Sequence, residues 1–312
     1  MNIIEIKNIS KKFEDKLVLD NISFNIEEGD IFGLIGPNGA GKSTLINIMT
    51  GLLDSNNGSI SIGGFDIKKE PLKAKEFLGL VPQELALMEN ISAYDNLEFF
   101  GSLYGLKRKT LKEKIGYALD ITGLTEKRND KVKKFSGGMK RRLNLAAAIM
   151  HEPKVLILDE PTVGIDPQSR NHIFEFIKSV NRERNATILY TSHYMEEVEY
   201  LCNNIFIMDE GKEIAYGNKK TVKSMISDNN KVNLRVDKIN KDLISNIELM
   251  DSVINCDTSP DEIKLLVKGD TFKLEPLLKI LEKNNSIIKS INVDEPNLEE
   301  VFLSLTGKNL RD

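Results

Sequence analysis

Residues 36–43 read GPNGAGKS and fit the pattern GxxxxGK[ST], whose chemistry is the binding of phosphate groups. Glycines let the chain curl so that successive backbone N–H groups converge on phosphate oxygens. Lys42 then reaches the β and γ phosphates of a nucleotide, and the Ser43 hydroxyl ligates Mg²⁺. The predicted nucleotide-binding loop comprises Gly36, Pro37, Asn38, Gly39, Ala40, Gly41, Lys42, Ser43 and Thr44.

A pair of adjacent carboxylates is the second chemical pattern. KVLILDEP, residues 154–161, places Asp159 and Glu160 at the end of an apolar run, where open α/β sheets bind ligands. Asp159 suits the ligand shell of Mg²⁺, and Glu160 suits the orientation and deprotonation of an attacking water. Taken alone, the motif is better explained as a solvated turn that ends a strand. Downstream of a phosphate loop, we favour the catalytic interpretation.

The helix predicted in FSGGMKRRLNLAAAIM, residues 135–150, begins with an unusual charge pattern. Its first turns carry Lys140, Arg141 and Arg142 and no acid. A helix N-terminus already has unpaired N–H groups and a partial positive charge, so cations there are unfavourable unless an anion lies nearby. Two interpretations remain open: a nearby anion, or a solvated basic face.

The elements that must position these residues follow from hydrophobic patterning. Short continuous apolar runs indicate strands covered on both faces, at 31–35, 155–158, 187–191 and 205–208. Alternation of apolar residues predicts half-buried, antiparallel strands around 22–26 and 60–62. Helical spacing without strand signals marks a helical insertion over about 85–150. Together these patterns predict an α/β core.

The pattern changes again after Tyr216-Gly217. Strands are predicted at 232–236, 263–267 and 287–293. Helical spacing joins Leu274, Leu277, Leu278 and Leu281, and again Leu298, Val301, Phe302 and Leu305. We therefore expect a small separate α+β domain over residues 218–312.

Composition excludes several classes of protein. The 312 residues carry a formal net charge of −4, so no basic excess indicates a nucleic-acid partner. Cys202 and Cys256 are too few for a disulfide framework or a cysteine-based metal site. Residues 31–53 form the most apolar window, but glycines and a proline interrupt it, and the N-terminus has no signal-peptide pattern. We expect a cytoplasmic protein that does not itself cross a membrane.

With these pieces in this order, residues 1–217 resemble the ATP-binding subunits of ABC transporters. Six landmarks carry the resemblance: the phosphate loop, Gln83 in LVPQE, SGGMK at 136–140, VLILDE, GIDP at 164–167, and His193 in TSHYMEE. The resemblance implies an α/β fold of the P-loop NTPase class, with a mostly parallel core sheet, an antiparallel β subdomain and a helical insertion. The C-terminal α+β domain would be an accessory to this cassette.

The resemblance also implies roles for individual residues. Gln83 would bind Mg²⁺ and link the site to the helical insertion, and His193 would contact the γ-phosphate of ATP. Phe13, in KKFEDK, occupies the place of the family's adenine-stacking aromatic, although it serves equally well as core filler. Without the resemblance, Gln83 is an ordinary loop residue and His193 an ordinary strand-end histidine.

The family geometry implies an origin for the anion near residues 135–150. Two subunits bind head to tail, so that Ser136, Gly137 and Gly138 cap the ATP held by the partner's phosphate loop, while Asp166 lies in the loop that crosses to the partner. EPNLEEVFLSLTGKNLRD, residues 295–312, is similar to the tails of ATPases that serve drug-, polysaccharide- and ion-exporting systems. The implied partners are a second cassette and a separate membrane permease, with the chain peripheral on the inner face of the cell membrane.

Three rival functions fit the sequence less well. ABC ATPases of DNA repair insert long coiled coils, which the 94 positions between Lys42 and Ser136 do not contain, and those of translation carry two cassettes in one chain. A phosphate-loop GTPase or kinase would not need SGGMK. A regulatory ATP binder without hydrolysis would lack one of Lys42, Asp159, Glu160 and His193. Export powered by ATP hydrolysis is therefore the favoured function, with action on ribosomes or DNA as the alternative.

Overall fold

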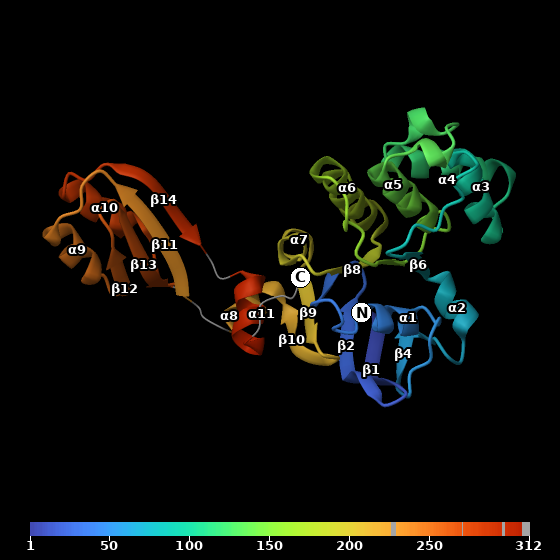
Figure 1. Ribbon diagram of the computed structural model, residues 1–312, viewed down its shortest axis with the longest axis horizontal. Coiled ribbons are helices and arrows are strands. Elements are labelled where there is room, and N and C mark those ends of the chain that lie inside the picture. Colours follow the sequence, from blue (N-terminus) through green and yellow to red (C-terminus); the bar gives the residue numbers. More distant parts are fainter. Residues whose placement is uncertain (226–228, 270, 295–296, 308–312) are drawn as a thin grey trace. The chain divides into compact units, whose positions relative to one another are not determined.

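The computed structural model describes residues 1–225, 229–269, 271–294 and 297–307 (Figure 1). Met1–Lys219 form one compact unit, and the chain from Lys220 forms a second. Each unit has its own sheet and its own apolar core.

The first unit is organised around a six-stranded sheet with the order β10-β9-β3-β8-β7-β6. Five neighbouring strands are parallel, and β10 pairs antiparallel with β9 at one edge. The strands are β3 (Ile31–Ile35), β6 (Leu78–Val81), β7 (Val155–Leu158), β8 (Thr187–Ser192), β9 (Asn204–Asp209) and β10 (Lys212–Asn218). Every residue of β3, β7 and β8 is buried, as the continuous apolar runs predict for strands covered on both faces.

The apolar alternation predicts the second sheet correctly. Its strands are antiparallel in the order β2-β1-β4-β5 and comprise β1 (Asn2–Phe13), β2 (Lys16–Glu27), β4 (Asn57–Ile62) and β5 (Phe65–Asp66). Ile22, Phe24 and Ile26 of β2 point into a core that includes Leu45 and Met49 of α1 (Lys42–Met49). The helix that follows the phosphate loop is thereby packed against this sheet.

Three helices dominate the segment between β6 and β7: α3 (Ala93–Leu103), α4 (Arg108–Ile121) and α5 (Gly137–Ala148). A capping box starts α3, in which the Ser92 hydroxyl accepts from the backbone N–H of Asp95 and the Asp95 carboxylate accepts from that of Ser92. Residues 85–150, all of which the structure describes, contain no strand. Figure 1 shows these helices grouped together beyond the β6 edge of the sheet. This arrangement confirms the predicted fold class.

Three further helices of the first unit complete the core. Helix α2 (Pro71–Glu76) precedes β6, α6 (Pro167–Arg184) lies between β7 and β8, and α7 (Met195–Leu201) lies between β8 and β9. None of the helices that the structure describes, in either unit, has the length and apolar character needed to span a membrane.

The second unit contains α8 (Lys219–Ser224) at its start and a four-stranded antiparallel sheet in the order β12-β13-β11-β14. Its elements follow as β11 (Asn229–Val236), α9 (Lys241–Glu248), β12 (Val253–Thr258), β13 (Glu262–Lys268), α10 (Leu274–Lys283), β14 (Ile288–Asp294) and α11 (Leu298–Thr306). The succession β11-α9-β12-β13-α10-β14 is the βαββαβ motif of ferredoxin-like folds.

The sequence pattern did not predict one strand of this unit. It also predicted wider buried faces for α10 and α11 than the structure has. Strand β12 lies at the edge of the sheet, and none of its side chains is fully buried. Because an edge strand needs no buried face, its sequence VINCDT shows no clear alternation of apolar and polar residues. Leu277 and Leu281 are buried as predicted, whereas Leu274 and Leu278 are 36% and 38% exposed. Leu305 of α11 is likewise exposed, and residues 295–296 and 308–312 of the quoted tail lie outside the described residues.

Candidate functional site

The phosphate loop turns sharply between β3 and α1. Gly41 caps α1 with a φ of 108°, a left-handed conformation, and a Cβ there would also lie 3.0 Å from the carbonyl oxygen of Val18. A side chain at this position would therefore strain the loop. The loop borders a pocket of about 320 Å³ lined by Lys16, Val18, Asn38, Gly39, Ala40, Gly41, Lys42, Ser43, Thr44, Gln83 and Glu160.

Lys42 is buried and directed at three oxygens. Its ammonium donates hydrogen bonds to the carbonyls of Gly36 (2.7 Å) and Pro37 (3.2 Å) and lies 3.2 Å from Oε1 of Glu160. The side chains of Lys42 and Glu160 are only 5% and 8% exposed. Because a buried charge is costly without a partner, the loop carbonyls and Glu160 stabilise this cation in place.

The neighbouring carboxylates face different partners, as their strand-end position predicts. Asp159 accepts a hydrogen bond from the Thr191 hydroxyl (2.9 Å), whereas Glu160 faces Lys42 and lies 3.4 Å from Nδ1 of His193. Burial raises the pKa of Asp159, and the hydroxyls of Thr191 and Ser43 act in the opposite direction. The two carboxylates thus lie in different surroundings, Asp159 against a hydroxyl and Glu160 between an ammonium and an imidazole.

Glu160 also has an uncommon backbone conformation. Its φ is 46°, in the left-handed region, and its N–H donates to the Thr191 hydroxyl (2.9 Å). Non-glycine residues are strained there and are held by their surroundings. Thr191 therefore holds the Asp159 carboxylate and the Glu160 backbone, a role that the sequence analysis missed. The role depends on the parallel pairing of β7 with β8, for which the sequence carries no local signal.

A second group of predicted site residues lies together elsewhere in the same unit. Ser136 caps α5, and Asp166 caps α6 by accepting from the N–H of Ser169 (2.9 Å). Gly138 packs against this cap, because a Cβ there would lie 2.1 Å from Oγ of Ser169 and 3.4 Å from Oδ2 of Asp166. Among the described residues, neither Ser136, Gly137, Gly138 nor Asp166 lines the Lys42 pocket. The predicted residues form two groups within one chain.

The three cations at the start of α5 find partners inside their own chain. Lys140 pairs with Glu89 (2.5 Å), and Arg142 donates to the carbonyls of Thr122 (2.8 Å) and Gly123 (3.2 Å). Arg141 is 5% exposed, so the interpretation as a solvated basic face is wrong for this residue.

Arg141 also connects the two groups of site residues. Its guanidinium donates to the carbonyls of Pro82 (2.8 Å) and Gln83 (2.6 Å). Burial lowers its pKa, and the negative charge of Asp159 opposes that shift. The loop that contains Gln83 is thereby tied to the helix that Ser136 caps.

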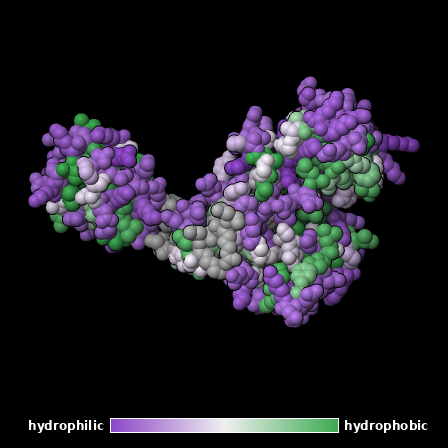
Figure 2. Space-filling model, in the orientation of Figure 1, coloured by the Kyte–Doolittle hydropathy of each residue, from purple (hydrophilic) through white to green (hydrophobic). Residues whose placement is uncertain are grey.

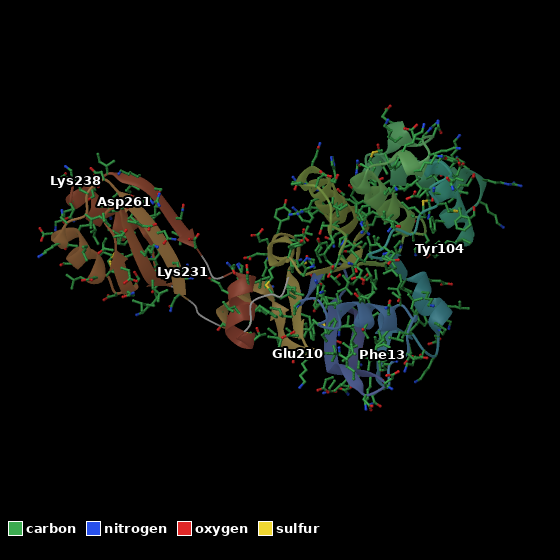
Figure 3. The ribbon with its side chains drawn as sticks, viewed as in Figure 1. Phe13, Tyr104, Glu210, Lys231, Lys238 and Asp261 are labelled. Atoms are coloured by element: carbon green, nitrogen blue, oxygen red, sulfur yellow. The ribbon has the colours of Figure 1, made fainter. Side chains whose placement is uncertain are left out.

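Phe13 does not line the pocket, although its hairpin does. The ring is 44% exposed on the β1 side of the unit, and the ammonium of Lys11 lies 4.9 Å from its centroid (Figure 3). Lys16, which pairs with Phe13 across the hairpin, and Val18 border the pocket instead. The predicted adenine contact of Phe13 stays a prediction, and Lys16 and Val18 are lining residues that the sequence analysis missed.

The residues around the pocket fit a nucleotide with Mg²⁺. The backbone N–H groups at the start of α1 and the Lys42 ammonium provide donors for phosphate oxygens. The Ser43 hydroxyl, the Asp159 carboxylate and the amide oxygen of Gln83 provide the hard oxygen ligands that Mg²⁺ prefers. Asp159 is buried beside the pocket, and its carboxylate is hydrogen-bonded to the side chain of Ser43.

Comparison with known proteins gives a consistent result. The family model "ABC transporter" matches residues 19–163. The linearmycin resistance ATP-binding protein LnrL of Bacillus subtilis is 44% identical over 99% of this chain and 100% of its own length. The Nod factor export ATP-binding protein I of Sinorhizobium fredii is 34% identical over 99% of this chain and 87% of its own length.

Solved structures show the same relationship. CbiO1 of Clostridium perfringens, part of the ABC transporter complex cbiONQ, is similar with a TM-score of 0.66 and 30% identity. The similarity covers 72% of this chain and 92% of cbiO1.

Proposed function

This chain belongs to the family of ABC transporter ATP-binding subunits, which are ATPases, and from that premise we propose that it powers export through a separate membrane permease. The two relatives described above are named for resistance and for export. Those names favour export over the alternative of action on ribosomes or DNA. We further propose residues 1–217 as the ATP-binding cassette and 218–312 as its accessory domain.

The observation that carries the catalytic proposal is the position of Glu160, which lines the pocket with Lys42 and lies 3.4 Å from Nδ1 of His193. Lys42 exchanges its contacts with the loop carbonyls for contacts with the β and γ phosphates of ATP. Glu160 orients the attacking water and accepts its proton, and His193 donates to the γ-phosphate. Ser43, Gln83 and Asp159 would hold Mg²⁺, which when bound neutralises charge on the phosphate oxygens.

The separation of the two residue groups supports a composite site between two cassettes. Ser136, Gly137, Gly138 and Asp166 lie together around the caps of α5 and α6 and away from the Lys42 pocket of their own chain. In the proposed ATP-bound dimer they contact the nucleotide of the partner cassette. A helix N-terminus with exposed N–H groups suits that anionic ligand.

The dimer is tested with Ser136→Arg in a Glu160→Gln background, where ATP persists. The chain without Ser136→Arg should form dimers on size-exclusion chromatography with ATP and Mg²⁺. The added guanidinium should keep the chain monomeric because it fills the space of the partner's phosphate. A persistent dimer would refute the cross-subunit contact.

An apolar groove provides the docking site for the permease. It has a volume of about 260 Å³ and is lined by Thr50, Leu52, Lys75, Leu78, Leu80, Pro82, Ala86, Phe100, Tyr104, Asn144, Ala147 and Ala148. Figure 2 shows apolar surface beside the notch where Figure 3 labels Tyr104. Pro82 and Ala86 flank Gln83, so an occupant of the groove contacts the loop that reaches the ATP pocket. In this proposal the chain is peripheral on the cytoplasmic face of the membrane.

Co-purification from membranes tests this docking. Tyr104→Glu should lose the permease, because a charge in the groove opposes an apolar partner segment. Tyr200→Glu is the matched control, since Tyr200 is similarly exposed (57% against 50%) and does not line the groove. Equal recovery of the permease with both variants would exclude the groove as the docking site.

A further inference from the structure

The helix that follows His193 in the chain carries a buried carboxylate, which has no role in the proposed hydrolysis. Glu197 of α7 is 3% exposed, and its Oε2 accepts hydrogen bonds from the hydroxyls of Thr162 (2.7 Å), Tyr190 (2.7 Å) and Ser192 (3.0 Å). All three donors are themselves at most 2% exposed. Burial, followed by the Glu197 charge, raises the pKa of Tyr190, which therefore remains a donor. Oε2 thus accepts three hydrogen bonds from buried hydroxyl groups.

Two of these hydroxyls belong to residues that lie close in the chain to Glu160 and His193. Thr162 follows Glu160 by two residues in the chain, and Ser192 directly precedes His193. The Ser192 hydroxyl also accepts the backbone N–H of Tyr194 (2.9 Å). The peptide group that follows His193 is thus held by a side chain that is itself anchored on Glu197.

The second carboxylate oxygen makes a looser contact with a different element. Oε1 of Glu197 lies 3.3 Å from Nε of Arg170, and among the described residues neither atom has a hydrogen-bond partner of good geometry. Arg170 lies in the first turns of α6, and its N–H donates to the carbonyl of Asp166 (2.9 Å). The start of α6 is therefore joined to the Glu197 cluster through one adjustable charge contact.

We propose that Glu197 is a positioning residue that couples the His193 loop to the Asp166 loop through Arg170. The inference rests on the proposed function, in which His193 meets the γ-phosphate and Asp166 meets the partner cassette. A shift of His193 toward phosphate moves Ser192 and Glu197, and the Arg170 contact transmits that shift to α6. Because a geometric chain of contacts is not by itself evidence of coupling, the test must measure coupling directly.

The experiment is a double-mutant cycle of Arg170→Gln and Glu197→Gln in the full chain. The control is Arg182→Gln, which removes an Arg that is 77% exposed from the same helix. Each single variant should lower kcat for ATP roughly 2- to 30-fold with KM unchanged. In a Glu160→Gln background each should raise the ATP concentration that gives half-maximal dimerisation. Arg170→Lys, which retains the charge, should recover most of the activity.

The outcomes separate coupling from a structural effect. A double variant no slower than the slower single variant supports the proposal, because both changes break one contact. The proposal is overturned if the losses of kcat in the two single variants multiply in the double variant. It is also overturned if Arg170→Gln has the wild-type kcat, or if Arg182→Gln loses as much kcat as Arg170→Gln. If Glu197→Gln does not fold, Arg170→Gln and Arg170→Lys still decide, since Arg170 is 37% exposed. An inactive wild-type chain would instead overturn the proposed function.

Discussion

The two units of this chain differ in where they keep their polar side chains. The first unit buries charged and hydroxyl groups around its pocket, among them Lys42, Asp159, Glu160, Thr191 and Glu197. In the described part of the second unit, Ser286 is the one buried polar residue, and the core is aliphatic. Burying a charge is costly unless it is paired, so the first unit retains such groups only in hydrogen-bonded clusters. The first unit therefore combines an apolar core with buried polar clusters, whereas the core of the second unit is aliphatic.

The largest expected effect belongs to the buried base. Glu160→Gln keeps the size of the side chain and removes its ability to accept a proton. We expect ATP binding to persist and turnover to fall by roughly 10²-fold or more. Single-turnover hydrolysis and nucleotide binding, measured on the same preparation, check this. Wild-type turnover would contradict the role given to Glu160.

A core substitution in the second unit sharpens the contrast, because its effect should be on stability alone. Leu265 is 2% exposed within the aliphatic core of that unit. Leu265→Ala should lower the free energy of unfolding by about 2–5 kcal/mol. Urea denaturation should show an earlier transition, while kcat and KM of the folded chain stay unchanged. A loss of catalytic activity in the folded variant would show that the core of the second unit contributes to catalysis as well.

Removal of the phosphate-loop cation should weaken the binding of nucleotide. Lys42→Ala deletes charge-assisted hydrogen bonds that we assign to the ATP phosphates, each worth about 1.5–3 kcal/mol. The Kd for MgATP, measured by calorimetry, should rise at least roughly tenfold. An unchanged Kd would remove Lys42 from the site.

The smallest effect should come from an exposed charge pair of the second unit. Lys279 lies 2.6 Å from Glu275 on α10, and both side chains are more than 70% exposed. Lys279→Gln should change the free energy of unfolding by less than about 0.5 kcal/mol, because water screens the pair. A larger shift in the urea midpoint would show that charges matter to this unit as well.

Local patterns were sufficient to predict part of this structure. The phosphate loop, the buried strands and the adjacent carboxylates depend on residues within a short stretch, so their spacing carries the information. The contacts of Thr191 with Glu160, of Arg141 with Pro82 and of Thr162 with Glu197 join residues that are 31, 59 and 35 positions apart in the chain. Their roles depend on which strands become neighbours, and residue type alone does not specify that. Strand β12 was missed for a different reason, since an exposed edge strand needs little apolar alternation.

The two carbonyls held by Arg141 have a mechanical consequence. A planar guanidinium that donates to consecutive carbonyls resists rotation as well as separation. We therefore expect the Gln83 loop and α5 to move as one rigid body. This body extends from the groove to the Ser136 cap. In the proposed dimer, a force applied by the permease to one cassette is delivered to the nucleotide of the other.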